Sequence, residues 1–135
     1  MSPFQVNDLT KQLVIDNISY LLNNFSSCPS FEYVICCWVM DSQDILDALE
    51  AKLKVTKEQL VTISLVCQEE QLIQRLQKDI EHHRRQPDSI PNSLARIANY
   101  KELNTIKVNV SDLTPLEAAK AIEQVVVGMV PKSNS

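Results

Sequence analysis

The sequence predicts an α/β fold of three layers, in which helices flank a small parallel sheet of about three strands. Two apolar runs, Tyr33–Val39 and Leu60–Cys67, lack the alternation of apolar and polar residues that marks a half-exposed strand. Such runs are typical of strands covered on both faces of a parallel sheet. Segments with apolar residues at helical spacing stand before, between and after them, so the order of elements favours β-α-β crossovers.

The first half of the chain predicts two helices with one strand between them. Apolar residues recur at helical spacing over residues 8–25, and the proline-containing stretch 26–30 ends that helix. The strand over 33–39 follows, and a second amphipathic helix occupies residues 42–53. The residues placed to cap these helices are Asn7 or Asp8 for the first and Asp41 or Ser42 for the second.

The second half predicts three helices and two strands. The strand over 60–67 leads into a long helix that starts after residue 68, and a short helix runs from 92 or 93 to about 103. A third strand spans 105–110, and an amphipathic helix over about 113–127 follows it.

Length and composition fit one soluble domain. We expect that domain over residues 1–130 of the 135, with 131–135 as a disordered tail. The longest apolar run, 33–40, is far shorter than the roughly 18 residues of a membrane helix, and the first residues lack the pattern of a signal peptide. The expected location is therefore the cytoplasm, without membrane contact.

The net charge of −4 combines an acidic first part with a basic later stretch. Residues 1–53 hold seven acids and two lysines, which gives −5, whereas residues 71–101 hold six cations and three acids, which gives +3. One basic stretch in an acidic protein favours a small anionic ligand over a nucleic acid, which calls for a broadly basic surface. The alternative is an ordinary solvated helix. Four residues of this stretch lie on one side of the long helix, namely Arg75, Lys78, His82 and Arg85.

The four cysteines do not predict a metal site. They are Cys28, Cys36, Cys37 and Cys67, with no C-x-x-C pair, and the two histidines of the chain are adjacent in sequence. Neighbouring side chains of a strand point to opposite faces, so Cys36 and Cys37 are poorly placed to bridge each other. We expect all four as small buried apolar residues in a reducing cytoplasm.

The chain holds a single glycine, Gly128, where average usage of roughly 7% predicts about nine. Glycine-rich loops bind phosphates because a residue without Cβ lets backbone N–H groups close around the anion. The chain therefore has neither a P-loop nor a dinucleotide-binding fingerprint. Gly128 itself is interpreted as the C-terminal stop of the last helix.

Four markers follow one another along the chain. They are the strand 33–39 with its helix, the strand 61–67 leading into Gln68-Glu69-Glu70-Gln71-Leu72-Ile73-Gln74-Arg75-Leu76, the segment Arg84-Arg85-Gln86-Pro87, and Arg96-x-x-x-Tyr100 before the last strand. In this order they resemble the later part of P-loop small-molecule kinases of the shikimate, gluconate and adenylate kinase type, with an uncharacterised bacterial AAA-type ATP-binding branch as the nearest group. The resemblance covers about residues 3–127 and implies a truncated P-loop kinase fold.

The resemblance also implies roles for individual residues. The basic segment after the long helix is in such kinases a mobile lid whose arginine stabilises the phosphates, and Arg84 or Arg85 matches it. Arg96 matches an arginine that faces the acceptor substrate or the phosphates. Arg75 is a further candidate for anion or nucleotide binding, and Asp41 is a candidate for orienting magnesium. The alternatives are solvent-facing helix residues for the arginines and a helix N-cap for Asp41.

The chain departs from these kinases because it begins after the P-loop, its lysine and its magnesium-holding hydroxyl. We therefore expect no catalytic residues, no phosphoryl transfer by the chain alone, and at most residual binding of a nucleotide or phosphorylated small molecule. Binding of ATP and magnesium as cofactors is expected only if a P-loop is supplied. Two alternatives stay open: a protein-interaction or regulatory module, and a reading frame truncated at the N-terminus of an active ATP-dependent small-molecule kinase.

The missing part has a consequence for the sheet. In the parent fold the P-loop strand lies between the strands that match 33–39 and 60–67. Removing it leaves backbone groups unpaired, which is costly if they are buried. We expect these two strands to pair directly, or the gap to be filled by a partner strand or a second copy at the exposed sheet edge.

Overall fold

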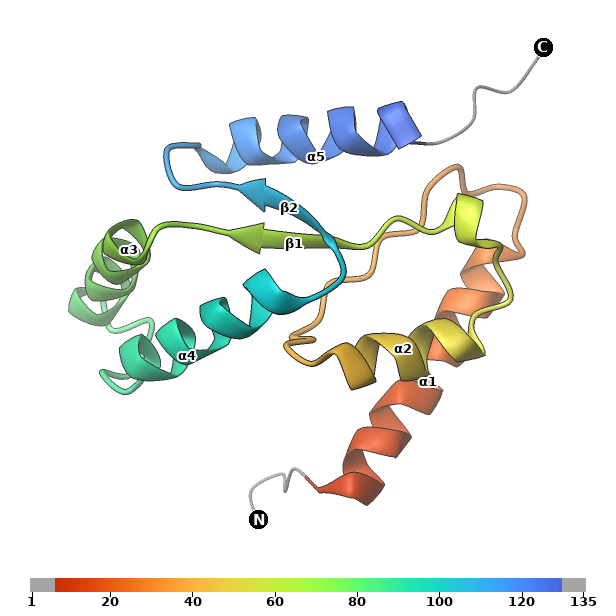
Figure 1. Ribbon diagram of the computed structural model, residues 1–135, viewed down its shortest axis with the longest axis horizontal. Helices are drawn as coiled ribbons and strands as arrows, with labels where there is room; N and C mark the ends of the chain where they lie inside the picture. The colour runs from red at the N-terminus through yellow and green to blue at the C-terminus, as the bar shows by residue number, and fades with distance from the viewer. Residues whose placement is uncertain (1–6, 130–135) are drawn as a thin grey trace. The chain divides into compact units, whose positions relative to one another are not determined.

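The computed structural model describes residues 7–129, so the expected tail at 131–135 lies outside the described residues. The chain divides into two compact units, the first ending at Thr56 and the second beginning at Lys57 (Figure 1). Each unit is described by itself below. No helix within residues 7–129 is long and apolar enough to span a membrane.

The first unit is a pair of packed helices, α1 (Asp8–Ser26) and α2 (Gln43–Lys52). Both were predicted from helical spacing. Asn7 caps α1 in a reciprocal arrangement, since its side chain accepts from the Thr10 backbone N–H and its own N–H donates to the Thr10 hydroxyl. Helices α1 and α2 bury few residues for their length, namely Ile15, Ser19, Leu46 and Leu49.

The predicted strand at 33–39 is wrong. Residues 31–42 form no helix or strand and connect α1 to α2 as an irregular segment. A strand exists only when its backbone is paired, and among the described residues the backbone of 32–41 makes no hydrogen bond. Its apolar side chains are correspondingly exposed, with Ile35 at 85% and Tyr33 at 54%. The direct pairing of 33–39 with the following strand is therefore also wrong.

The second unit holds a parallel sheet of two strands rather than about three. Strand β1 (Ile63–Val66) pairs with β2 (Ile106–Asn109), with Ile63 opposite Ile106 and Val66 opposite Asn109. Both strands were expected, and both are shorter than predicted. The α/β class and the flanking of a small parallel sheet by helices are confirmed at this coarse level.

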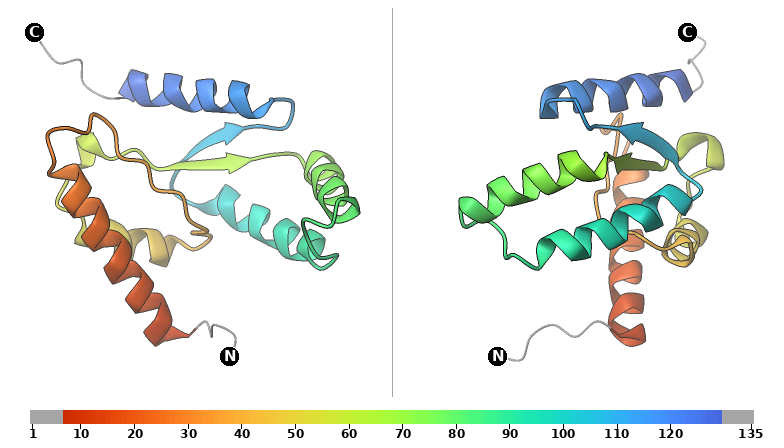
Figure 2. Two further views of the ribbon diagram at one scale, coloured as in Figure 1. Left: turned by 180° about the vertical axis from the view of Figure 1, so that it is seen from behind. Right: turned by 60° about the vertical axis from the view of Figure 1, so that its left-hand side comes forward.

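Three helices and one short turn of 3₁₀ helix complete the second unit. The turn η1 (Lys57–Gln59) precedes β1, helices α3 (Glu69–Glu81) and α4 (Ser89–Glu102) connect the two strands, and α5 (Pro115–Met129) follows β2. Both views of Figure 2 place α5 along one side of the strands and α4 along the other. Contacts between α4 and β1, and between α3 and α4, hold this arrangement together.

The core of the second unit is small. Its buried apolar residues are Leu76 of α3, Ile97 of α4, Val108 of β2, and Cys67 and Leu103, which directly follow β1 and α4. Helix α5 buries none. A pair of hydroxyls, Ser64 Oγ and Thr105 Oγ1 at 2.6 Å, links the beginnings of the two strands. Helix α5 contributes only a half-buried stripe of Ala118, Ala121, Ile122, Val125 and Val126.

Three boundaries differ from the prediction. Helix α3 ends at Glu81, so His82 and Arg85 lie beyond it and the expected basic face is not one continuous helix surface. Helix α4 begins at Ser89, earlier than expected, because Pro91 fits the first turn of a helix. Gly128 is helical and has no positive φ, so its interpretation as the stop of α5 is wrong.

Candidate functional site

Arg75 projects from α3 toward the segment that follows β2. Its Nη2 donates to the backbone oxygens of Val110 at 2.8 Å and Ser111 at 2.9 Å, with a longer contact of 3.4 Å to Leu113. A guanidinium suits this position because it carries several donors and stays charged. Arg75, predicted as an anion-binding residue, thus contacts three backbone carbonyl oxygens and connects the β2–α5 loop to α3.

The carboxyl ends of both strands meet at the same point. Ser111 is buried, and its hydroxyl accepts from the Gln68 backbone N–H at 2.8 Å, at the start of α3. The Ser111 hydroxyl also donates to Asn109 Oδ1 at 2.6 Å, and Asn109 Oδ1 accepts a second hydrogen bond from the Ser111 backbone N–H at 2.9 Å. The carboxyl edge of a parallel sheet is where α/β proteins usually bind ligands. Here its polar groups satisfy one another.

Arg84 and Arg85 lie in the turn after α3 and share one carboxylate. Arg84 Nη1 is 3.4 Å from Asp79 Oδ1, and Arg85 Nε is 3.3 Å from Asp79 Oδ2. His83 has a φ of 56°, the left-handed conformation that turns the chain back toward α3. Two cations therefore face one carboxylate here, while Glu81 and Asp88 bring the stretch 78–88 as a whole to zero net charge. Both side chains are more than half exposed, at 64% and 54%.

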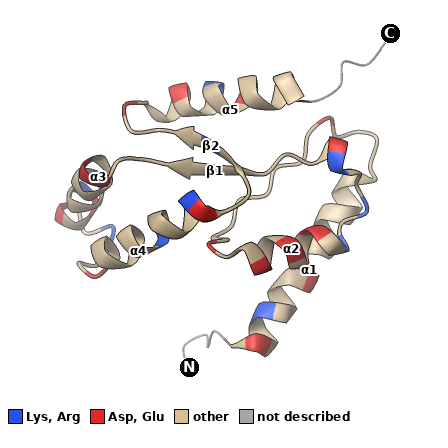
Figure 3. Ribbon diagram, viewed as in Figure 1, with Lys and Arg blue, Asp and Glu red and all other residues tan. Residues whose placement is uncertain are grey.

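The structure brings together only two of the four candidate arginines. Arg84 and Arg85 meet at Asp79, whereas Arg75 faces the β2–α5 loop. Arg96 is exposed on α4, and no hydrogen bond or ion pair joins its side chain to another residue in the range 7–129. Figure 3 shows that positively and negatively charged residues are mixed along the helices of the second unit.

Asp41 does not cap α2, because the N-cap residue of this helix is Ser42. The Ser42 side chain makes no capping hydrogen bond. Asp41 instead borders an open hollow of about 470 Å³ in the first unit. The residues that line this hollow are Asp8, Lys11, Gln12, Ile15, Asp41, Ser42, Asp44 and Ile45. Within the described part of the chain, no three side chains of the metal-binding types cluster closely enough to hold an ion.

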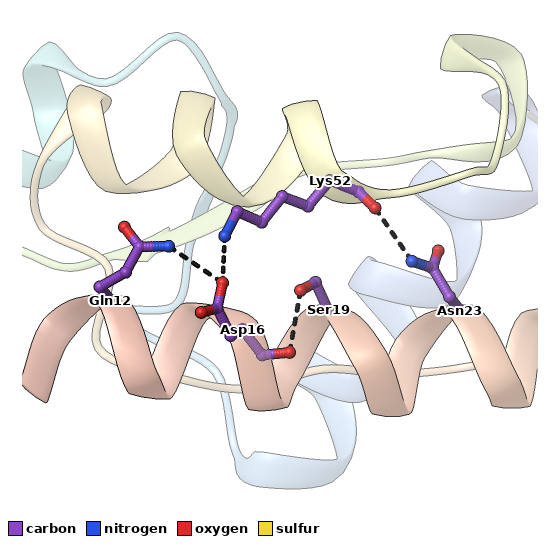
Figure 4. Close-up of polar contacts among 5 residues, drawn as sticks. All are labelled: Gln12, Asp16, Ser19, Asn23 and Lys52. Atoms are coloured by element: carbon purple, nitrogen blue, oxygen red, sulfur yellow. Dashed lines mark hydrogen bonds and ion pairs between the residues drawn. The ribbon is translucent and has the colours of Figure 1, made fainter.

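Polar contacts fix the end of α2 to the side of α1 (Figure 4). Asn23 accepts from the Lys54 backbone N–H at 2.8 Å and donates to the Lys52 carbonyl at 2.9 Å. Asp16 forms an ion pair with Lys52 and accepts from Gln12, and these hydrogen bonds lower the pKa of its carboxyl group. These contacts join the C-terminal end of α2 to α1, and none of them involves the segment 31–42.

The segment 31–42 is the feature that the sequence did not reveal. It is almost free of charge, with Glu32 and Asp41 as its only ionisable acids or bases apart from the thiols and Tyr33 (Figure 3). Only its beginning is anchored, because the rings of Phe25 and Phe31 meet edge to face at 5.8 Å. Composition predicted a buried strand here, and the resemblance to P-loop kinases indicated that a neighbouring strand is missing, but neither predicted that 33–39 would form no strand.

Two adjacent cysteines lie within this segment, and both are exposed rather than buried as expected. Partial covering of the Cys36 thiol raises its pKa, and the neighbouring Cys37 raises it further. Of the other two cysteines, Cys67 is buried as expected and Cys28 is half-buried.

Comparisons with protein-family models, with curated proteins and with solved structures gave no match to this chain.

Proposed function

We propose that the chain is a protein-interaction module that assembles with a second copy of itself by strand addition. The segment 33–39 of one copy adds to the free edge of β1 in the other. The observation that carries this proposal is the unpaired backbone of 32–41 combined with exposed apolar side chains on both of its faces. An extended peptide with these properties gains main-chain hydrogen bonds and buries apolar area when it joins a sheet.

The chain itself carries a matching edge. A sheet of two strands is marginally stable, and each of its strands has one edge without a partner strand in the described residues. The two edges differ in chemistry. Strand β2 carries Lys107 and Asn109, the kind of residues that discourage edge pairing, whereas residues 60–66 around β1 carry no charge. The edge of β1 is therefore the one open to addition.

Length and symmetry also favour a second copy. The apolar run 33–39 has seven residues and the run 60–67 has eight, so each covers the other along its length. Exchange between two copies is reciprocal, because each supplies one segment and one edge. Such an exchange closes at two copies and leaves no free segment to extend a fibre.

The oligomeric state of the full chain tests the proposal. Sedimentation velocity between about 1 and 100 µM is expected to show a species of twice the 15.3 kDa chain mass. Ile35→Lys in the segment and Leu65→Lys on β1 are each expected to yield monomer, since a lysine on an edge strand opposes pairing. Leu116→Lys on α5 is the matched control, because Leu116 is similarly exposed at 65% and lies outside both surfaces.

Each other result has a definite meaning. A wild-type monomer at the highest concentration overturns the second copy as the partner. Slow hydrogen exchange at 33–39 in such a monomer would mean that the segment pairs within its own chain. A dimer that survives both Ile35→Lys and Leu65→Lys overturns strand addition. Circular dichroism of each variant checks that the helices are retained.

We also propose a second function, weak anion binding at the turn that holds Arg84 and Arg85. It follows from the resemblance to the lid of P-loop kinases and is supported by the two guanidinium groups that share the single carboxylate of Asp79. A phosphate offers several oxygens to such a pair and is held by charge-assisted hydrogen bonds. The chain carries no P-loop, so nucleotide binding without phosphoryl transfer is the expected activity.

Calorimetric titration with Mg-ATP and with pyrophosphate tests this second function. Binding in the millimolar range is expected for the wild type, with at least a tenfold loss in the double variant Arg84→Ala/Arg85→Ala. Lys120→Ala on α5 serves as a control, because it removes one exposed cation at a distance along the chain. No heat at millimolar ligand, or equal binding by the double variant, overturns the assignment.

A further inference from the structure

We propose that Cys36 and Cys37 form a dithiol that hydroperoxides oxidise to a disulfide between the two adjacent residues. Both cysteines are exposed and both lie in a segment with no regular structure. The modification site is thus accessible to a small oxidant and free of the backbone pairing that would hold the sulfurs apart. This inference does not depend on the proposed function.

The absence of a strand is what makes the bridge feasible. In a pleated strand the two side chains would point to opposite faces, and no disulfide could join them. Residues 32–41 make no backbone hydrogen bond within the described chain, so rotation about their φ and ψ angles breaks no ladder. The other two cysteines are less suited to bond with Cys36 or Cys37, because Cys67 is buried and Cys28 is separated from Cys36 by seven intervening residues.

The order of attack follows from the protonation of Cys36. Partial covering of its thiol and the neighbouring Cys37 raise the pKa of Cys36, so a smaller fraction of Cys36 is present as the reactive thiolate. Cys37 therefore makes the first attack. Its thiolate sulfur bonds to one peroxide oxygen, the O–O bond breaks, and the leaving oxygen departs as water or alcohol after taking up a proton. Cys37 is then a sulfenic acid.

The second step closes the ring. Cys36 loses its proton and attacks the sulfur of the Cys37 sulfenic acid, so that the S–S bond forms and the S–O bond breaks. The hydroxide that leaves becomes water. In sum, two thiols give up two electrons and two protons, and one hydroperoxide is reduced to water and its alcohol, or to two waters for hydrogen peroxide.

The bridge should reverse readily under reducing conditions. Consecutive Cα atoms are about 3.8 Å apart, whereas disulfides usually join Cα atoms about 4.4–6.8 Å apart. A disulfide between neighbours is therefore strained, and strained, exposed disulfides are the labile ones. The closed ring also cannot adopt the pleat, so oxidation would block addition of the segment to any sheet edge.

Peptide mapping of the intact chain after treatment with hydrogen peroxide tests the inference. The expected product is a peptide holding both Cys36 and Cys37 that has lost two hydrogen atoms and regains them with dithiothreitol. In Cys36→Ser, dimedone should trap a sulfenic acid on Cys37, whereas Cys37→Ser should react more slowly. Cys28→Ser is the matched control and should form the bridge as the wild type does.

Other products overturn the inference. These are stepwise oxygen addition to a single thiol without loss of hydrogen, a bridge that requires Cys28, and a disulfide between two chains. Oxidation is carried out at a protein concentration at which sedimentation shows monomer, because pairing of the segment in a sheet would hold the two sulfurs apart. A chain that forms the bridge but never dimerises would refute the proposed function and leave the dithiol intact. A chain that dimerises at high concentration but does not form the bridge as a monomer would refute the dithiol and leave the proposed function intact.

Discussion

The contact of Arg75 with the β2–α5 loop gives a direct test of how the second unit is held together. Replacing Arg75 by methionine keeps an unbranched apolar stem and removes the guanidinium. The bonds to the carbonyls of Val110 and Ser111, at 2.8 and 2.9 Å, are lost with it. The loop then keeps its other hydrogen bonds, such as the one from the Val110 N–H to the Val66 carbonyl, but loses its bonds to the Arg75 side chain, so the unit should unfold more easily.

The size of the effect can be worked from the exposure of these groups. A hydrogen bond from a charged donor contributes about 1.5–3 kcal/mol when it is well protected from water. Arg75 is exposed, and only its bond to Ser111 is partly buried, so water replaces much of what is lost. We expect about 1 kcal/mol after this discount. For a unit of this size, that corresponds to a fall in Tm of about 4–8 °C.

Thermal unfolding followed by circular dichroism measures the change, and Lys78→Met provides the control. Lys78 lies on the same helix and is exposed, and its side chain makes no hydrogen bond or ion pair within the described residues. Its replacement should leave Tm within about 1 °C of the wild type. A similarly small shift for Arg75→Met would refute the reasoning, because the contact would then contribute nothing. Unchanged binding of pyrophosphate by Arg75→Met would assign Arg75 to structure alone.

Three further outcomes are expected. The hydrogen bond to Lys52 lowers the pKa of the Asp16 carboxyl group in the folded protein. The stabilisation from Asp16 is therefore complete above the unfolded-state pKa near 3.8 and is lost as the pH falls through the lower folded-state pKa. Asp16→Asn should remove this part of the pH dependence of stability, measured by urea unfolding at a series of acidic pH values. Thr114→Ala should cost about 1 kcal/mol in chemical denaturation, because the hydroxyl accepts from the Glu117 N–H at 3.2 Å at the start of α5. Leu76→Ala should cost at least about 2 kcal/mol in the same assay, since Leu76 is only 5% exposed.

Local signals in the sequence were sufficient for the helices. Capping residues and helical spacing located α1 and α2 to within a few residues, and the apolar stripe of α3 includes the buried Leu76. These features depend on residues three or four apart, which the sequence displays directly. The two short strands were also found, because their apolar runs stand between turn signals.

Features that depend on distant residues could not be predicted in this way. The run 33–39 has the composition of a buried strand, but a strand requires a partner, and composition does not report whether one is present. The spacing of Arg75 placed it on an exposed face, yet its acceptors lie 35 to 38 residues later in the chain. The turn that brings Arg84 and Arg85 to Asp79 depends on where α3 ends, which is the least predictable property of a helix.

The irregular connection between α1 and α2 also contains Trp38, the single tryptophan of the chain, and this residue is half-buried. Indole fluorescence from the whole protein therefore originates in this one segment. Entry of the segment into a sheet would move the indole out of water and shift its emission to shorter wavelength. Serial dilution of unlabelled protein would then yield a dissociation constant, and rapid mixing would time the docking and release of the segment.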